Sequence, residues 1–153
     1  GLNILAKNYN YFEKQKFEKV ILTPHPKEAS RLLNCEISDI LNDIEGVAVN
    51  ISKKYNCITV LKTHNTIITT PNGEKHQNTS GNSALAKAGS GDILTGIISG
   101  IIAQGADLFE GTCTGVYIHG LCADFAKEKL TEYSVLAEDL ISFIPNAISS
   151  IKD

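Results

Sequence analysis

The sequence predicts an α/β domain with a largely parallel central sheet and a helical C-terminal layer. Short apolar, β-branched segments alternate with amphipathic segments in the first half of the chain, whereas the strong patterns after residue 92 are all helical. The length of 153 residues is that of one ordinary domain with one core. We therefore expect residues 1–153 to belong to a single domain.

The first half is expected to contain the strands. Its predicted elements are, in order, a strand at 18–23, helices at 27–33 and 45–55, and strands at 58–61, 65–70 and 74–77. The first strand ends at Pro24, because proline donates no backbone hydrogen bond. Val47, Ile51 and Tyr55 recur every four residues, which is typical of one face of an amphipathic helix. The Pro-Asn-Gly at 71–73 predicts the turn of a hairpin between the last two strands.

The second half is expected to be helical. A helix is predicted at 93–104 and ends at Gly105, followed by helices at 108–130 and 135–151, the last bent at Pro145. Strands and helices thus alternate first, and helices finish the domain.

Composition and charge argue against two classes of partner. The net charge is −3, and lysine and arginine are scattered, so no basic surface for nucleic acid or an anionic membrane is predicted. The longest apolar run, residues 93–103, is too short to span a bilayer, and no secretory leader pattern is present. The four cysteines form no metal-binding pattern and are expected to be reduced thiols. We expect a cytoplasmic protein.

A glycine-rich turn precedes the most apolar predicted helix. Gly89, Ser90 and Gly91 stand where loop becomes helix, so their backbone N–H groups and the positive end of the helix dipole favour an anion. Asp92 follows directly and has two interpretations: a helix N-cap, or a general base for a substrate hydroxyl beside the anion. Neither the Walker pattern nor Gly-x-Gly-x-x-Gly is present.

The surrounding spacing resembles a known signature. The pattern N-x-x-G-N-x-x-L-A-x-x-G-S-G-D is met between Asn78 and Asp92. It is similar to that of the ribokinase-like superfamily, in the branch of the nucleotide-dependent NAD(P)H-hydrate dehydratases. The resemblance implies a three-layer α/β/α fold, an anion hole formed by the amides of residues 89–91, and Asp92 as catalytic base. It also implies that Gly91 contacts the nucleotide, and that Asn82 and Asp92 contact the substrate.

Two further segments resemble the same family. Thr-Pro-His-Pro-Lys-Glu at 23–28 is similar to a segment whose histidine, here His25, contacts the hydrated nicotinamide; Lys27 replaces the usual glycine. Residues 60–66 are similar to the strand and turn that hold the nucleotide, with Thr63 in place of the usual glycine. The nucleotide-binding residues implied are Lys62, Thr63, His64, Asn65 and Thr66.

From residue type alone, other interpretations of these side chains stay open. His25 could be an ordinary loop histidine, Lys62 a solvated strand end and Thr66 an ordinary strand residue. His76 and His119 have no partner pattern, and His119 is expected to be packed within a helix. No acidic pair specifies metal ligands, so no metal site is predicted from the residues themselves.

The resemblance implies repair of hydrated NADH or NADPH. A nucleotide phosphorylates the ring hydroxyl, and phosphate then leaves to regenerate the reduced cofactor, with ADP converted to AMP and phosphate. ADP, or ATP in its place, is the implied phosphoryl donor, with Mg²⁺ as its companion ion. A homo-oligomer and a fused or separate NAD(P)H-hydrate epimerase are further expectations.

The chain resembles only part of a family domain, and two other functions fit its residues. The resemblance covers essentially all of the chain but only the C-terminal portion of a longer family domain, and Gly1 in place of an initiator methionine suggests N-terminal truncation. The alternatives are a ribokinase-like kinase for a sugar, pyrimidine alcohol or thiazole alcohol, or a non-catalytic nucleotide-binding fragment. The Pro-His-Pro setting of His25 and the spacing from Asn78 to Asp92 favour the dehydratase.

Overall fold

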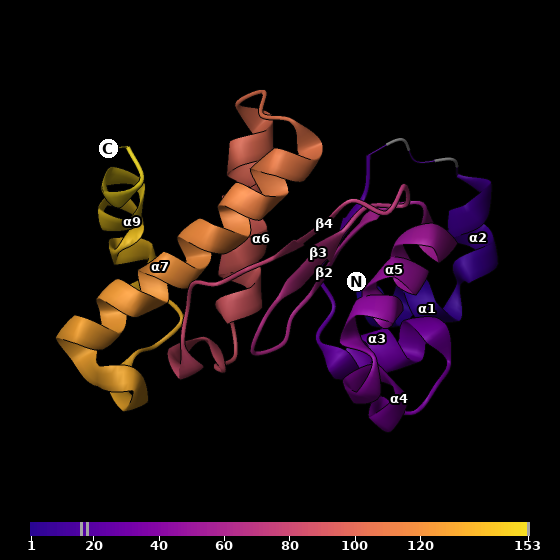
Figure 1. Ribbon diagram of the computed structural model, residues 1–153, viewed down its shortest axis with the longest axis horizontal. Helices are drawn as coiled ribbons and strands as arrows, with labels where there is room; N and C mark the ends of the chain where they lie inside the picture. Colours follow the sequence, from indigo (N-terminus) through magenta and orange to yellow (C-terminus); the bar gives the residue numbers. More distant parts are fainter. Residues whose placement is uncertain (16, 18, 153) are drawn as a thin grey trace. The chain divides into compact units, whose positions relative to one another are not determined.

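The computed structural model describes residues 1–15, 17 and 19–152. They form two compact units, residues 1–77 and 78–153, which are described separately (Figure 1). The single-domain assignment of the sequence stays a prediction. Within the described residues, no helix is both long and apolar enough to cross a membrane.

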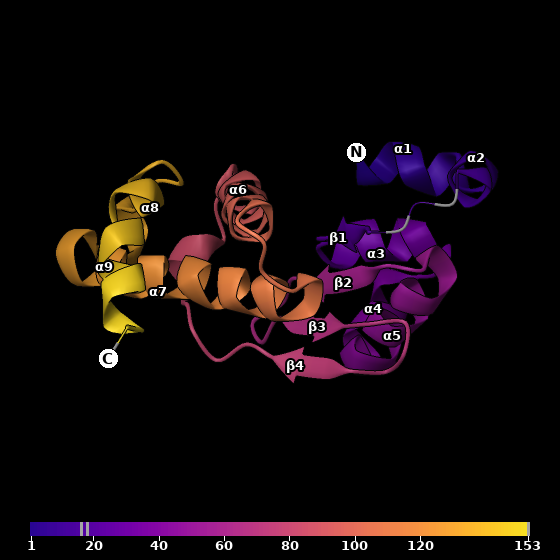
Figure 2. The same cartoon turned by 90° about the horizontal axis from the view of Figure 1, so that it is seen from above.

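The first unit packs helices against a small sheet. Its elements are α1 (Leu2–Lys7), α2 (Tyr9–Lys14), β1 (Ile21–Leu22), α3 (Pro26–Leu33), α4 (Ile37–Asn42), α5 (Ile44–Tyr55), β2 (Ile58–Leu61), β3 (Ile67–Thr69) and β4 (Lys75–Gln77). The strands lie side by side in the order β1-β2-β3-β4 (Figure 2). The predicted α/β class is confirmed, and β2 has the predicted bounds. Residue 18 of the first predicted strand lies outside the described residues.

The sheet is mixed, whereas the sequence predicted a largely parallel one. β1 pairs with β2 in parallel, but β2–β3 and β3–β4 are antiparallel. The connections explain the difference. Three helices lie between β1 and β2, and a parallel pair needs such a crossover. The five residues 62–66 and the turn around Gly73, where φ is 93°, are too short to join anything but antiparallel neighbours.

The core of this unit lies between α5 and the strands. Val47, Ile51 and Tyr55 are buried, which confirms the predicted apolar face. Behind them the hydroxyl of Ser52 donates to Thr59 Oγ1 at 2.9 Å and lies 2.7 Å from Thr69 Oγ1. Buried polar atoms are stable only when paired, and this hydroxyl cluster ties α5 to β2 and β3.

The parallel pair of strands positions the first group of site residues. Ile21 aligns with Ile58, and Leu22 with Thr59. Because parallel strands run in the same direction, the segments that follow them, beginning at Thr23 and at Lys62, emerge at the same edge of the sheet.

In the second unit, the described residues form helices joined by loops and turns, and no strand. Its elements are the 3₁₀ turn η1 (Ser83–Leu85), α6 (Ser90–Ala103), α7 (Leu108–Ser134), α8 (Asp139–Ser142) and α9 (Ile144–Ser150). α6 and α9 both pack on α7 (Figure 1). Gly115 allows the close crossing of α6 and α7, since a Cβ there would lie 2.8 Å from Ile98 Cγ1.

The predicted helices of the second unit differ from the structure in their bounds. α7 continues to Ser134 beyond the predicted end at residue 130, with a non-helical backbone at Thr131. The helix expected at 135–151 is divided into α8 and α9, and Pro145 lies in the first turn of α9, where a missing N–H costs nothing. α6 begins at Ser90, three residues before the predicted start at 93, because Gly89 takes a left-handed conformation with φ of 89° and serves as the N-cap.

Candidate active site

His25 begins α3 and is fixed there by a capping box. Its Nδ1 accepts a hydrogen bond from the backbone N–H of Glu28 at 3.3 Å, and its own N–H donates to Glu28 Oε2 at 2.9 Å. Pro26 occupies the first helical turn, where its fixed φ suits the helix. The imidazole is 48% exposed, and its Nε2 lies 3.4 Å from Glu28 Oε2. The ring is therefore oriented by the helix end and still reaches solvent.

Lys62 lies beside this histidine turn. Its backbone N–H donates to the carbonyl of Pro24 at 2.9 Å, which continues the parallel pairing beyond β2. Its Nζ donates to the Thr23 carbonyl and lies 4.0 Å from Glu28 Oε2. The structure thus brings together His25 and Lys62, which the sequence assigned to substrate and nucleotide respectively.

Glu28 links these two residues, and the sequence analysis gave it no role. Its carboxylate faces both the imidazole of His25 and the ammonium of Lys62. A glutamate three residues after a helix start is the sequence sign of a capping box, and this sign could have identified it.

The turn after Lys62 is closed by its own hydroxyl groups. Thr63 Oγ1 donates to the Asn65 carbonyl at 2.8 Å, and Thr66 Oγ1 donates to the Thr63 carbonyl at 3.4 Å. Thr63 is not among the residues with positive φ, so the threonine in place of the usual glycine is not strained. His64 and Asn65 are exposed at the tip. The nucleotide-binding role of this turn stays a prediction.

In the second unit, the glycine turn presents two open amide groups. The N–H of Ser90 donates to the Lys87 carbonyl at 3.3 Å, and the Asp92 N–H donates to the Gly89 carbonyl at 3.0 Å. The N–H groups of Gly89 and Gly91 have no acceptor among the residues that the structure describes. Unpaired amides at a helix start favour an anion.

Asp92 lies in the first turn of α6 and is exposed. The N-cap interpretation of this residue is wrong, since Gly89 is the N-cap and no side chain caps the helix. Its carboxylate has no hydrogen bond or ion pair with any other described residue. The arrangement therefore leaves an acceptor of protons beside donors to an anion, as general-base chemistry requires.

The side chain of Ser90 points away from this opening. Its Oγ lies 3.2 Å from Nε2 of His119 on α7, and both residues are buried. His119 is packed in its helix as predicted, but its contact with the glycine turn was not anticipated. No spacing rule links residues 29 positions apart, so the sequence carried no signal for it.

Asn82, the predicted substrate ligand, is engaged inside the unit. Its Nδ2 donates to Asp124 Oδ1 at 2.8 Å, and its Oδ1 accepts from the Ala84 N–H at 3.0 Å. One N–H and one lone pair of the amide remain for a ligand. Asp124 was also missed by the sequence analysis.

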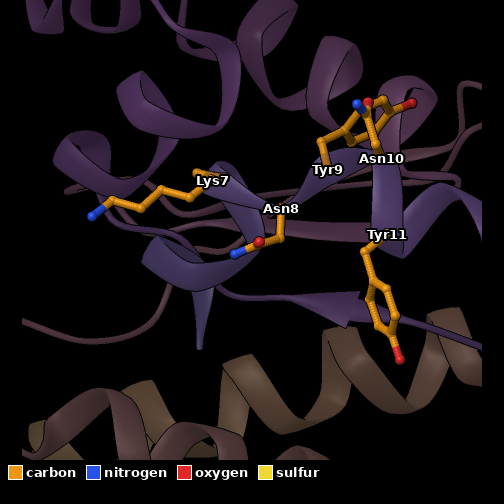
Figure 3. A pocket seen from close by; sticks show the side chains of 6 residues that line it. Lys7, Asn8, Tyr9, Asn10 and Tyr11 are labelled. Carbon is orange, nitrogen blue, oxygen red and sulfur yellow. The ribbon is translucent and has the colours of Figure 1, made fainter.

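Metal binding and cavities add no further site. In the described part of the chain, no three His, Cys, Asp or Glu side chains gather to hold a metal ion. Mg²⁺ commonly binds through few carboxylates and the phosphates of its nucleotide, and Asp92 is the open carboxylate beside the turn. A hollow of about 370 Å³ is lined by Ala6–Tyr11, between α1 and α2, and contains none of the predicted site residues (Figure 3).

Two cysteine thiols are unreactive at neutral pH. Burial raises the pKa of Cys57 to about 11 and that of Cys122 to about 11. Both therefore stay protonated at neutral pH, and neither is a nucleophile there.

Known proteins are similar to this chain over most of its length. The sequence model of the NAD(P)H-hydrate dehydratase family matches residues 1–146. An ADP-dependent (S)-NAD(P)H-hydrate dehydratase from Neisseria meningitidis serogroup B is 43% identical over 111 residues, which are 72% of this chain and 38% of that protein.

Solved structures agree on the fold. The ADP/ATP-dependent NAD(P)H-hydrate dehydratase of Bacillus subtilis, co-crystallised with ATP and Mg²⁺, matches with a TM-score of 0.83 and 32% identity over 86% of this chain and 48% of that one. A ribokinase-like superfamily protein from Enterococcus faecalis V583 matches with a TM-score of 0.75 and 32% identity over 92% of this chain and 49% of that one.

The chain therefore spans 38% of the Neisseria relative and about half of each crystallised protein, 48% and 49%. Over that span it has a ribokinase-like fold. The family match extends over nearly all of its residues, and both the histidine turn and the glycine turn lie inside the matched region. This chain belongs to the NAD(P)H-hydrate dehydratase family.

Proposed function

We propose that this protein removes water from hydrated NADH and NADPH with ADP as the phosphoryl donor. The observation that carries the proposal is the turn at the start of α6. It combines two amide groups without acceptors, those of Gly89 and Gly91, with the exposed and unpaired carboxylate of Asp92. Family membership and the name of the Neisseria relative support this choice of substrate and donor.

The chemistry makes a poor leaving group into a good one. Asp92 takes the proton from the ring hydroxyl while the oxygen of that hydroxyl attacks the β-phosphorus of ADP. The bond from that phosphorus to the bridging oxygen breaks, and AMP leaves. Phosphate then departs from the ring with the electron pair of its C–O bond, a ring proton is lost, and NADH or NADPH is restored.

The glycine turn would stabilise the charge of the phosphoryl group. Phosphoryl transfer depends on positioning and electrostatic stabilisation, and fixed backbone N–H groups provide both. The N–H groups of Gly89 and Gly91 are the donors available, while that of Ser90 is engaged with Lys87. Mg²⁺, when bound with the nucleotide, would neutralise phosphate charge and would be held mainly by the phosphates and water, because Asp92 is assigned to the proton.

The residues of the first unit would bind the two reactants. We assign the imidazole of His25 to the hydrated nicotinamide, because the capping box holds it while leaving it 48% exposed. We assign Lys62 and the turn of residues 63–66 to the nucleotide, since a lysine ammonium attracts phosphate as a point charge. Asn82 would use its remaining N–H toward the substrate.

The deciding experiment is turnover of hydrated NADH by the natural full-length protein. Return of the absorbance of reduced nicotinamide is followed with ADP, with ATP and with neither. We expect recovery that requires a nucleotide and is faster with ADP. Folded protein that binds ADP but restores no NADH would contradict the proposal. The same turn would then support the kinase for a small alcohol, to be assayed with the sugar, pyrimidine and thiazole alcohols.

The remaining expectations are kept as part of the proposal. Residues 1–153 would form the C-terminal portion of one catalytic domain, the protein would form a homo-oligomer, and an epimerase, fused or separate, would supply the reactive epimer of the substrate.

A further inference from the structure

The segment that leads to the glycine turn is fastened to the side of α7. Ser80 Oγ donates to the Tyr117 carbonyl at 2.8 Å. A Cβ on Gly120 would lie 2.0 Å from Ser80 Oγ. Gly81 has φ of 99°, and a Cβ there would lie 3.2 Å from Gly120 Cα. Backbone meets backbone at this point, and the two glycines are what permit it.

One carboxylate holds the loop where it meets the helix. Asp124 Oδ2 accepts from the Gly81 N–H at 2.9 Å, and Oδ1 accepts from Asn82 Nδ2 at 2.8 Å. Asn82 in turn caps η1 through the Ala84 N–H at 3.0 Å. Hydrogen bonds to a carboxylate are roughly twice as strong as neutral ones, so Asp124 attaches this loop firmly to α7. Ser83 Oγ donates to a second carboxylate of α7, that of Glu132.

The attachment reaches the proposed site through a short connection. Six residues, 83–88, separate Asn82 from Gly89, and η1 shortens this segment further. At the other end of the segment, Oγ of Ser90, the first residue of α6, lies 3.2 Å from Nε2 of His119 on α7. Both ends of the segment are therefore tied to α7, and the position of Asn82 restricts that of the open amides.

We propose that Asp124 is a positioning residue of the phosphoryl-binding turn, acting through Gly81 and Asn82. It would not touch nucleotide or substrate. Its carboxylate would hold the loop in the one arrangement that places the amides of Gly89 and Gly91 and the carboxylate of Asp92 together. The catalytic meaning of this role rests on the proposed function, whereas the attachment itself does not.

The hydrogen-bond pattern allows an exchange of partners that tests the role. Asp124→Asn would put an amide N–H₂ against the N–H₂ of Asn82, and Asn82→Asp would put a carboxylate against Asp124. The double variant Asn82→Asp/Asp124→Asn restores all three bonds: the bond between the two side chains runs in the opposite direction, from the amide now at position 124 to the carboxylate now at position 82, while the Gly81 and Ala84 N–H groups still donate. Its net charge equals that of the wild type. Glu128→Gln is the matched control, because Glu128 lies one turn further along α7 and is exposed. Its side chain has no hydrogen bond or ion pair with another described residue.

The measurement is hydrogen exchange by mass spectrometry on the full-length protein. We expect peptides covering residues 78–84 to exchange about tenfold faster or more in each single variant, since loss of a bond to a charged group costs that factor or more. The double variant should return toward the wild-type rate, and peptides covering β2 should not change. Rates in Asp124→Asn within twofold of Glu128→Gln, or a double variant no slower than the singles, would overturn the proposal.

Folding is checked by circular dichroism in each variant. If a single variant does not fold, folding of the double variant still supports the pairing, and failure of the double variant to fold overturns it. Folded Asp124→Asn should also show kcat lowered about tenfold or more with a smaller change in KM for ADP. Unchanged kcat would contradict the positioning role. If the wild type does not restore NADH, the proposed function fails, and the exchange rates alone decide the role of Asp124.

Discussion

The two groups of proposed site residues differ in how their polar atoms are satisfied. In the first unit, His25, Glu28 and Lys62 bind one another and the neighbouring backbone. In the second unit, the turn at the start of α6 leaves two amides and the carboxylate of Asp92 open to a ligand. Paired groups hold their geometry, whereas unpaired ones retain their capacity to stabilise charge. The turn therefore keeps groups available to a ligand, whereas the histidine cluster of His25, Glu28 and Lys62 is held in place by its own contacts.

The largest effect is expected from Asp92. Asp92→Asn keeps the shape of the side chain but removes the base, so kcat should fall about 10²- to 10⁴-fold while ADP still binds. Steady-state turnover and calorimetric titration with ADP measure the two quantities. Glu110→Gln is the control, since Glu110 is the acidic residue in the first turn of α7. Full activity of Asp92→Asn would remove the general base from the mechanism.

Adding a side chain at Gly89 should lower activity, whereas adding one at Gly73, another glycine with positive φ, should not. Gly89→Ala and Gly73→Ala both place alanine at positive φ, 89° and 93°, which costs about 1–2 kcal/mol of folding stability. Only at Gly89 does the added Cβ meet a neighbour, Ala137 Cβ at 3.2 Å.

Gly89→Ala should therefore lower both the unfolding free energy and kcat, and Gly73→Ala only the former. Urea unfolding and turnover, measured on the same preparations, make the comparison. Equal kcat in the two variants would show that the conformation of the turn is not needed for the reaction.

Substitutions in the histidine cluster should mainly lower the free energy of unfolding. Glu28→Ala breaks the capping box and should cost about 1 kcal/mol of unfolding free energy, whereas Glu28→Gln can still accept the bond from the His25 N–H. Urea unfolding of both variants distinguishes the contribution of the capping hydrogen bond to stability from that of the carboxylate charge. If Glu28→Gln costs as much as Glu28→Ala, the negative charge of Glu28 facing Lys62 holds the cluster instead of the cap.

The smallest effect is a loss of stability in alkali. Burial raises the pKa of the Cys57 thiol from 9.0 to about 11, so the unfolded chain releases this proton first as pH rises. The contribution is fully present below pH 9.0 and is lost as pH rises toward about 11. Urea unfolding between pH 8 and pH 11 should show a steeper decline for the wild type than for Cys57→Ala. Parallel curves would contradict the buried thiol as the cause.

Local patterns were sufficient for most helices and strands. The strand at 58–61 and the hairpin around Gly73 were predicted because alternation, β-branching and turn chemistry depend on neighbours in the chain. The sheet direction was predicted less well, since pairing of β2 with β3 depends on the length of a connection whose ends were uncertain. The helix start at Ser90 was missed because it depends on the left-handed φ of Gly89.

By itself, the sequence predicted His25, Lys62 and residues 89–92 as candidate site residues, and it predicted the family to which the chain belongs. Motif spacing records both, because the backbone geometry of a turn or helix start requires particular residues at fixed offsets. Only the tertiary structure decided which polar groups are already paired. Glu28 with Lys62, Ser90 with His119, and Asn82 with Asp124 meet across 34, 29 and 42 positions, respectively. Such contacts arise from the packing of one element on another, for which a single sequence contains no periodic signal.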